Sequence, residues 1–272
     1  MTPIHAKELR NGGKLLLTNG ITSLEGASGG GLTPWAVIAG NETRDGIGLS
    51  AHATLVELRD YDYRSVGAAV GLFDRVELSI ARQRFNTREI GALLGLGRDY
   101  AFEQDIVGAK VRVAGDLVYD RLPAIAVGAQ YKHNRNGPVV RAIGAQHDSG
   151  VDYYASASKL LLGQSILASG TVRLTKANQM GILGYGGDKS DAYSVQFEGS
   201  LGWQVSRRMA VGAEYRSKPD KLSIAREDDW YDIFAVYAIN RHLTATAAYT
   251  DLGSIATVKD QRGVLFSLQT AF

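Results

Sequence analysis

The segment YSVQFEGSLGWQV, residues 193–205, alternates between two kinds of side chain over its whole length. One set is mostly large and apolar: Tyr193, Val195, Phe197, Gly199, Leu201, Trp203 and Val205. The other set is small or polar: Ser194, Gln196, Glu198, Ser200, Gly202 and Gln204. A period of two places the sets on opposite faces of a β-strand. Such a run is long for a strand of a soluble protein, whereas a tilted strand of about 9–11 residues crosses a bilayer.

The same alternation recurs along the chain. We find about twelve runs, near 46–56, 62–72, 75–85, 103–115, 121–131, 151–162, 165–176, 191–205, 208–218, 229–239, 241–251 and 262–272. Their regular spacing predicts an all-β protein. The fold class that follows is a closed antiparallel transmembrane β-barrel of about 12 strands.

The connections between these runs alternate in length. Tight turns are expected at Phe73-Asp74, Gly163-Gln164, Ser206-Arg207 and Asn240-Arg241, and long polar or glycine-rich loops at 86–102, 132–150, 177–190, 219–228 and 252–261. Short turns at one end and long loops at the other are typical of outer-membrane barrels. Six tyrosines share the apolar parity near the long loops, as in an interfacial aromatic girdle: Tyr131, Tyr153, Tyr193, Tyr215, Tyr231 and Tyr249. Lys159 makes the faces of its strand ambiguous.

Composition excludes several classes. The 272 residues include 30 Lys and Arg, 28 Asp and Glu and no Cys. Disulfides and thiolate metal sites are therefore excluded, and no basic block with aromatics suggests a nucleic-acid partner. No run reaches the roughly 18 apolar residues of a membrane helix. No secretory signal is present in the sequence as given, so export would require a signal peptide removed ahead of Met1.

The last run ends on Phe272, which we expect to face outward on the closing strand. A terminal Phe on an alternating strand resembles the signal read by the outer-membrane assembly machinery, and we expect that machinery as a partner beside the lipid bilayer. A closed barrel leaves no backbone group unpaired in lipid.

Six stretches resemble a family from Gram-negative bacteria, the domain of unknown function 3034. They are KLLLTNGITSLEGASGGGLTPWAVIAG (14–40), GLFDRVELSIARQRF (71–85), KVRVAGD (110–116), VGAEYRSKPD (211–220), AREDDWYD (225–232) and DQRG (260–263). The resemblance spans nearly the whole chain. It implies an outer-membrane location in a Gram-negative bacterium and carries no activity.

Residues 1–45 are expected to form an N-terminal periplasmic or lumen-lining segment ahead of the barrel at 46–272. The stretch EGASGGGLTPWAVIAG is glycine-rich and apolar on both faces, which suits close packing inside a lumen. The alternative makes 14–20 and 32–40 two more strands, giving 14.

Charged residues at mid-strand should face the lumen. We expect Glu198, Glu214 and Asp232 to form one acidic patch, opposed by a basic wall of Lys110, Arg112 and Arg173. Opposed walls of this kind orient polar solutes in a pore. The alternative is a salt-bridge network that supports a closed barrel.

Other candidate sites are weaker. His52 is expected in the lumen beside Ser50 and Thr54, as a hydrogen-bonded residue rather than a catalytic base. Glu227, Asp228 and Asp229 could hold a divalent cation, but a solvated loop or pairing with Arg226 explains them better, and no metal site or cofactor is expected. Arg64, Arg82 and Arg84 share the outward parity and are candidates for lipopolysaccharide phosphates, the alternative being snorkelling at the interface.

The function expected from these features is passive diffusion of small solutes through an outer-membrane channel, without enzymatic activity. One alternative is uptake of small apolar compounds gated by the N-terminal segment. The other is a closed scaffolding barrel that transports nothing.

Overall fold

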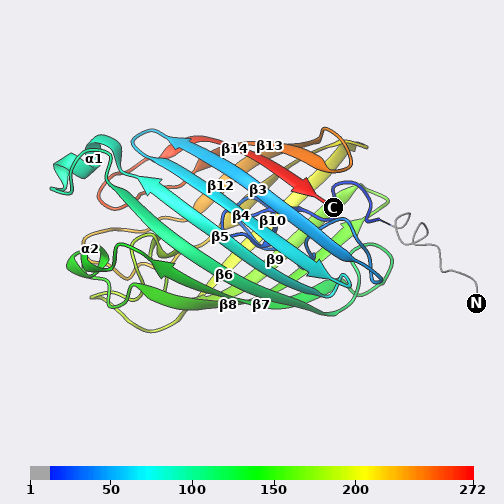
Figure 1. Ribbon diagram of the computed structural model, residues 1–272, viewed down its shortest axis with the longest axis horizontal. Coiled ribbons are helices and arrows are strands. Elements are labelled where there is room, and N and C mark those ends of the chain that lie inside the picture. The colour runs from blue at the N-terminus through cyan, green and yellow to red at the C-terminus, as the bar shows by residue number, and fades with distance from the viewer. Residues whose placement is uncertain (1–12) are drawn as a thin grey trace, which may run out of the picture.

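The computed structural model describes residues 13–272, in which twelve antiparallel strands form a closed barrel (Figure 1). The strands are β3 (Ile47–Leu58), β4 (Asp62–Leu72), β5 (Val76–Asn86), β6 (Ala101–Ala114), β7 (Ala124–Asn134), β8 (Ser149–Leu161), β9 (Ile166–Thr175), β10 (Ser194–Ser206), β11 (Met209–Arg216), β12 (Trp230–Ala238), β13 (Leu243–Asp251) and β14 (Arg262–Ala271). Pairing of β14 with β3 closes the barrel. The predicted twelve strands are confirmed, and the alternative of 14 is wrong because 14–20 and 32–40 contribute no barrel strand.

The remaining elements are short. β1 (Ile21–Thr22) and β2 (Ser28–Gly29) pair with each other ahead of the barrel. α1 (Arg88–Leu93), α2 (Gly137–Ala142) and the 3-10 turn η2 (Gln179–Gly181) lie in loops. No helix among residues 13–272 is long and apolar enough to cross a membrane.

Polarity across the barrel wall is the reverse of that in a soluble protein. Along β3, exposed and buried residues alternate over all 12 positions. Large apolar side chains such as Phe197 and Ile233 are 60% and 68% exposed on the outer face, whereas His52 and Gln83 are buried inside. This arrangement suits a lipid-facing exterior and a polar interior, because apolar side chains gain nothing from burial when the surroundings are hydrocarbon.

Loop lengths also follow the prediction. α1, α2 and the long loops lie at one end of the barrel, together with the short β3–β4 connection 59–61, and the other short turns lie at the opposite end with Phe272 (Figure 1). Phe73 and Asp74 both have positive φ, 54° and 50°, as a type I′ hairpin turn requires. We call the two ends the loop end and the turn end. The longest connection at the turn end is 115–123, where Asp116 accepts hydrogen bonds from the Val118 and Tyr119 amides.

Residues 20–39, named the inner segment, lie inside the barrel and are buried throughout. Their backbone amides donate to inward side chains on separate parts of the wall: Ser28 N to Glu77 on β5, Leu32 N to Glu214 on β11, and Ala36 N to Ser158 on β8. The segment enters and leaves at the turn end, where Lys14 N donates to Asn41 O over 2.8 Å.

A second buried stretch, residues 177–187, belongs to the β9–β10 loop and enters the barrel from the loop end. Asn134 Nδ2 on β7 donates to Ile182 O, and Gln104 Nε2 on β6 donates to Met180 O. The barrel interior is therefore filled from both ends.

Candidate functional site

Glu25 of the inner segment lies at the centre of a buried ion network. Its carboxylate contacts Lys132 on β7, Arg173 on β9 at 3.2 Å and Arg216 on β11 at 2.8 Å. All four side chains are at most 4% exposed. Glu25 thus ties the inner segment to three strands of the wall.

Two further carboxylates complete this network. Asp152 lies 2.5 Å from Lys132 and 3.3 Å from Arg173, and Glu198 lies 2.5 Å from Arg173. The resulting Glu25 cluster holds three carboxylates, from Glu25, Asp152 and Glu198, and three cations, from Lys132, Arg173 and Arg216. Buried charges are tolerated when they are paired and hydrogen-bonded in this way.

The predicted acidic patch is divided by the strand register. Glu214 and Asp232 are direct partners between β11 and β12, as predicted. Glu198, however, lies opposite Arg216, and Ser200 takes the place opposite Glu214. The prediction assumed equal depth for residues at equal distances from the turn end, but tilted strands are staggered. Glu198 therefore lies in the Glu25 cluster and not beside Glu214 and Asp232.

The predicted basic wall does not face an acidic wall either. Lys110 Nζ lies 3.1 Å from Glu77 and donates to Ser28 O, and Arg112 pairs with Asp74 at 2.7 Å. Arg173 belongs to the Glu25 cluster. Each basic residue has an acidic partner nearby, so the opposed acidic and basic walls expected from the sequence are not formed. A role for any of these residues in permeation stays a prediction.

His52 is buried on the inner face, as its parity predicts. Its Nε2 lies 3.2 Å from Ser65 Oγ, and its Nδ1 has no hydrogen-bond partner. Ser65 in turn donates to Leu24 O of the inner segment. A Ser–His pair used for catalysis needs an acid that orients the histidine through its second nitrogen, and this pair lacks one.

The acidic loop residues point in different directions. Glu227 is buried, lies 3.4 Å from Lys218 and accepts from Gln179 N, whereas Asp229 accepts from the Tyr215 hydroxyl. Burial raises the pKa of Glu227 and lowers that of Lys218 to about 8. Asp228 accepts from Ser254, which lowers its pKa. Among residues 13–272 no group of three or more His, Asp or Glu side chains could hold a metal ion.

The outer surface carries the arginines and tyrosines that the parity assigned to it. Arg64, Arg82 and Arg84 are exposed near the loop end, but Arg82 pairs with Asp105 at 2.6 Å and Arg64 with Asp62 at 3.6 Å. These carboxylates compete with any lipid phosphate, and the lipopolysaccharide contact stays a prediction.

The tyrosine belt is present as predicted. Tyr153 packs near Tyr193 and Tyr215 near Tyr231 across neighbouring strands, with ring centroids 6.2 and 5.2 Å apart. Lys159 faces outward near the turn end, where its ammonium group donates to carbonyls of the 115–123 connection. At the turn end Phe272 is 54% exposed, and its proposed reading by the assembly machinery stays a prediction.

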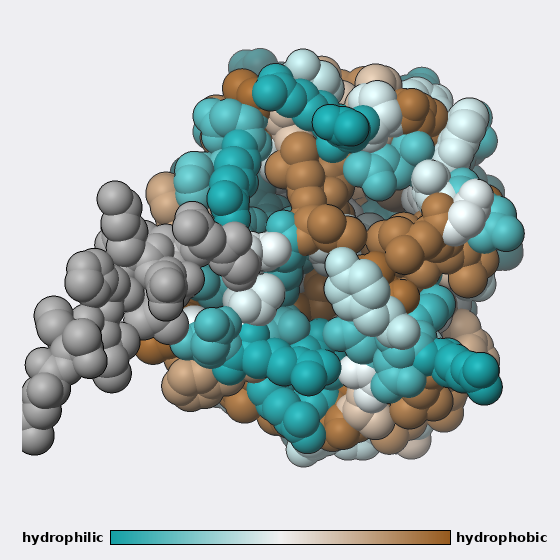
Figure 2. Space-filling view, turned by 90° about the vertical axis from the view of Figure 1, so that its right-hand side faces the viewer, coloured by the Kyte–Doolittle hydropathy of each residue, from teal (hydrophilic) through white to brown (hydrophobic). Residues whose placement is uncertain are grey.

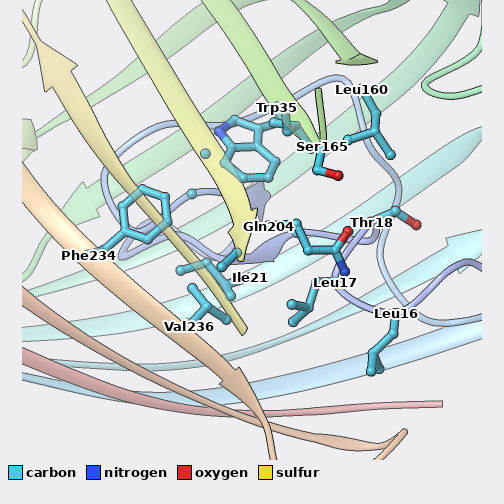
Figure 3. A pocket seen from close by; sticks show the side chains of 15 residues that line it. Leu16, Leu17, Thr18, Ile21, Trp35, Leu160, Ser165, Gln204, Phe234 and Val236 are labelled. Carbon is cyan, nitrogen blue, oxygen red and sulfur yellow. The ribbon is translucent and has the colours of Figure 1, made fainter. Parts of the chain in front are cut away.

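A small apolar recess opens at the turn end. Figure 2 looks onto this end and shows apolar side chains in a hollow bordered by polar ones. The recess, about 50 Å³ in volume, lies between the inner segment and the wall, and Figure 3 shows Ile21, Trp35 and Phe234 around one space. Leu160, Leu167 and Val236 extend the same apolar lining.

Four members of the Glu25 cluster were missed by the sequence analysis: Glu25, Lys132, Asp152 and Arg216. Glu25 lies in a stretch without strand periodicity, so nothing in its neighbourhood indicates its direction. Lys132, Asp152 and Arg216 do share the inward parity of their strands, and that parity could have identified them.

Comparison with known proteins is consistent with this geometry. The model of a family described as "Protein of unknown function (DUF3034)" matches residues 18–269. No curated protein matches the sequence. Among solved structures, the KdgM porin aligns with a TM-score of 0.54 at 10% identity, covering 82% of this chain and 99% of that one.

Two other solved structures agree on the architecture. A KdgM porin in complex with disordered oligogalacturonate gives a TM-score of 0.53 at 9% identity, covering 82% and 99% of the two chains. The NanC porin gives 0.52 at 10% identity, covering 82% and 98%. At such identities the likeness establishes the fold alone, a closed antiparallel barrel similar to that of these porins.

Proposed function

We propose that this chain, which belongs to the family of proteins of unknown function DUF3034, is a gated outer-membrane channel for small solutes, closed by its inner segment. Its place would be the outer membrane of a Gram-negative bacterium. The porin-type fold supports a channel. The filled interior argues against a pore that is permanently open.

The observation that carries the proposal is the way the inner segment is held. It is anchored by side chains of β5, β8 and β11 through the amides of Ser28, Ala36 and Leu32, and by the Glu25 cluster. These anchoring contacts are polar, and water can replace them when the segment leaves the lumen, whereas the buried side chains of Leu24, Leu32 and Trp35 would become exposed.

A crosslink that fixes the inner segment tests gating. Thr33 Oγ1 on the segment and Ser200 Oγ on β10 are 2.7 Å apart, close enough for a disulfide after substitution of both by Cys. The chain has no native Cys, so the pair is free of competing thiols. We expect single-channel openings in the parent, none in oxidised Thr33→Cys/Ser200→Cys, and their return on reduction.

The matched control places the same crosslink within the wall. Thr54 Oγ1 on β3 and Ser267 Oγ on β14 are also 2.7 Å apart, and neither belongs to the inner segment. Oxidised Thr54→Cys/Ser267→Cys should conduct like the parent. A parent without openings, and a variant lacking residues 20–39 that also fails to conduct, would leave the scaffolding barrel as the better account.

Uptake of small apolar compounds is a second candidate, favoured by the apolar recess at the turn end. In vesicles containing the protein, entry of a small apolar solute and a polar solute of similar size can be compared. A preference for the apolar solute that is lost on substitution of Phe234 by Gln would favour this candidate over general diffusion.

A further inference from the structure

Glu214 and Asp232 differ from every other buried acid discussed above because no cation faces them. They are direct cross-strand partners with inward side chains, 3% and 4% exposed. Like charges directly opposite on neighbouring strands repel each other. None of the ion pairs that the structure gives for residues 13–272 includes either carboxylate.

Neutral hydrogen bonds satisfy both carboxylate oxygens of Glu214. Its Oε2 accepts from Leu32 N over 2.9 Å, and its Oε1 accepts from Thr33 Oγ1 and Ser200 Oγ. Asp232 Oδ1, by contrast, is buried without a hydrogen-bond partner. A buried carboxylate oxygen left in this state is costly unless a ligand satisfies it.

A second unpartnered oxygen lies next to Asp232. Thr250 on β13 is the direct register partner of Asp232 on β12. The two residues share the inward face, and Thr250 is fully buried with its Oγ1 unpaired. Glu214, Asp232 and Thr250 therefore form a row of oxygen-bearing side chains across β11, β12 and β13.

The inner segment leaves a space against this row at Gly31. A side-chain carbon on Gly31 would lie 3.4 Å from Glu214 Oε2, 3.7 Å from Asp232 Oδ2 and 3.9 Å from Leu265 Cδ1. Glu214 Oε2 and Asp232 Oδ2 thus border one position where a single carbon atom would fit, and the absence of a Cβ at residue 31 leaves that position free.

We infer that Glu214, Asp232 and Thr250 form a binding site for a hard divalent cation at the contact between the inner segment and the wall. Two carboxylates balance the charge of one such cation, and carboxylate, hydroxyl and backbone oxygens are the ligands that Ca²⁺ accepts in irregular geometry. The cation would offset the charge of Asp232, whose Oδ1 has no hydrogen-bond partner, and remove the repulsion between the two acids. Because Glu214 also holds Leu32 and Thr33, the bound cation would strengthen the anchoring of the inner segment.

The site is tested by binding of Ca²⁺ to the purified barrel after treatment with a chelator. Calorimetry should give one Ca²⁺ per chain in the parent. Asp232→Asn removes a ligand without changing its shape, and Gly31→Ala fills the space without displacing protein atoms, since its contacts of 3.4–3.9 Å are ordinary. We expect each to weaken binding at least tenfold. Gly170→Ala, which adds a methyl group with nothing within 4 Å, should bind like the parent.

The outcomes separate this site from the gating proposal, because binding is measured without conductance. A parent that binds no Ca²⁺, or variants Asp232→Asn and Gly31→Ala that bind it as the parent does, would overturn the inference. Folding of each variant is checked by far-UV circular dichroism. If Gly31→Ala fails to fold, Asp232→Asn decides alone.

Discussion

The barrel interior contains two groups of buried carboxylates that differ in how their negative charge is compensated. In the Glu25 cluster three carboxylates meet three cations, and Glu25 itself contacts all three. In the pair of Glu214 and Asp232, two carboxylates meet only neutral donors, and one oxygen has no partner. Both groups touch the inner segment. The first explains how the segment is held, and the second indicates where a ligand can act on it.

The largest effect on the free energy of unfolding should follow from removing one charge of the Glu25 cluster. Substituting Glu25 by Gln leaves Lys132, Arg173 and Arg216 with less negative charge in a buried site. Removing one partner of a buried ion network costs about 3–5 kcal/mol. Reversible folding into lipid vesicles measures the free energy of unfolding. As a control, Glu42→Gln, at a half-buried position outside the inner segment, should change the free energy of unfolding little. A decrease as large as that for Glu25→Gln would show that the Glu25 cluster contributes no more than an ordinary carboxylate.

An intermediate effect on the free energy of unfolding is expected from the titration of Lys218, which forms a buried pair with Glu227 outside the strands. The pKa of Lys218 is lowered by burial from 10.5 to about 8. Between these pH values the unfolded chain binds more protons than the folded one, so this group makes the protein more stable as pH rises from 8 to 10.5, and that gain is lost again as pH falls from 10.5 to 8. Relative to Lys218→Met, the parent should gain about 1–3 kcal/mol over this range.

The measurement is the difference in free energy of unfolding between parent and Lys218→Met, taken at several pH values. Because Lys218 lies 4.5 Å above the Trp230 ring, tryptophan fluorescence of the parent should also change with a midpoint near pH 8. If the difference in free energy of unfolding does not change with pH, and the parent shows no fluorescence transition, the ammonium group of Lys218 is not desolvated.

The smallest effect should follow from removing the unpaired charge. In the presence of a chelator, Asp232→Asn should leave the free energy of unfolding unchanged or raise it by up to about 1 kcal/mol, because it relieves repulsion with Glu214. The same measurement in Ca²⁺ should favour the parent, since a ligand stabilises the state that binds it. A large decrease in the free energy of unfolding of Asp232→Asn in chelator would show that the Asp232 carboxylate stabilises the protein as the Glu25 cluster does. The two groups would then not differ in the way described above.

Alternation in the sequence predicts the strands because each residue of a barrel wall faces either lipid or lumen. Phe197 and Gln196 fall on their predicted faces for this reason. The depth of a residue depends on the register between strands, which period-two patterns do not encode. Glu198 was therefore placed beside Glu214, although it lies opposite Arg216.

The inner segment shows a second limit. Glu25 lies between serine- and glycine-rich residues without periodicity, and its partners are over 100 residues away in the chain. Only the closed barrel brings Lys132 and Arg216 to it. The glycines and apolar residues of 20–39 favour a location in the lumen, but the contacts that hold the segment depend on long-range geometry.

The inner segment enters and leaves through the same mouth, where Lys14 meets Asn41. It is thus a loop tethered at both ends on one side, and its withdrawal would thread no chain through the barrel and open no pairing between strands. Movement in and out requires local exchange of hydrogen bonds and ion pairs for water and exposure of buried apolar side chains such as Leu24 and Trp35. The wall could therefore complete its closure before the loop enters, and the loop could retract and return repeatedly without any cost to the integrity of the membrane seal formed by the strands.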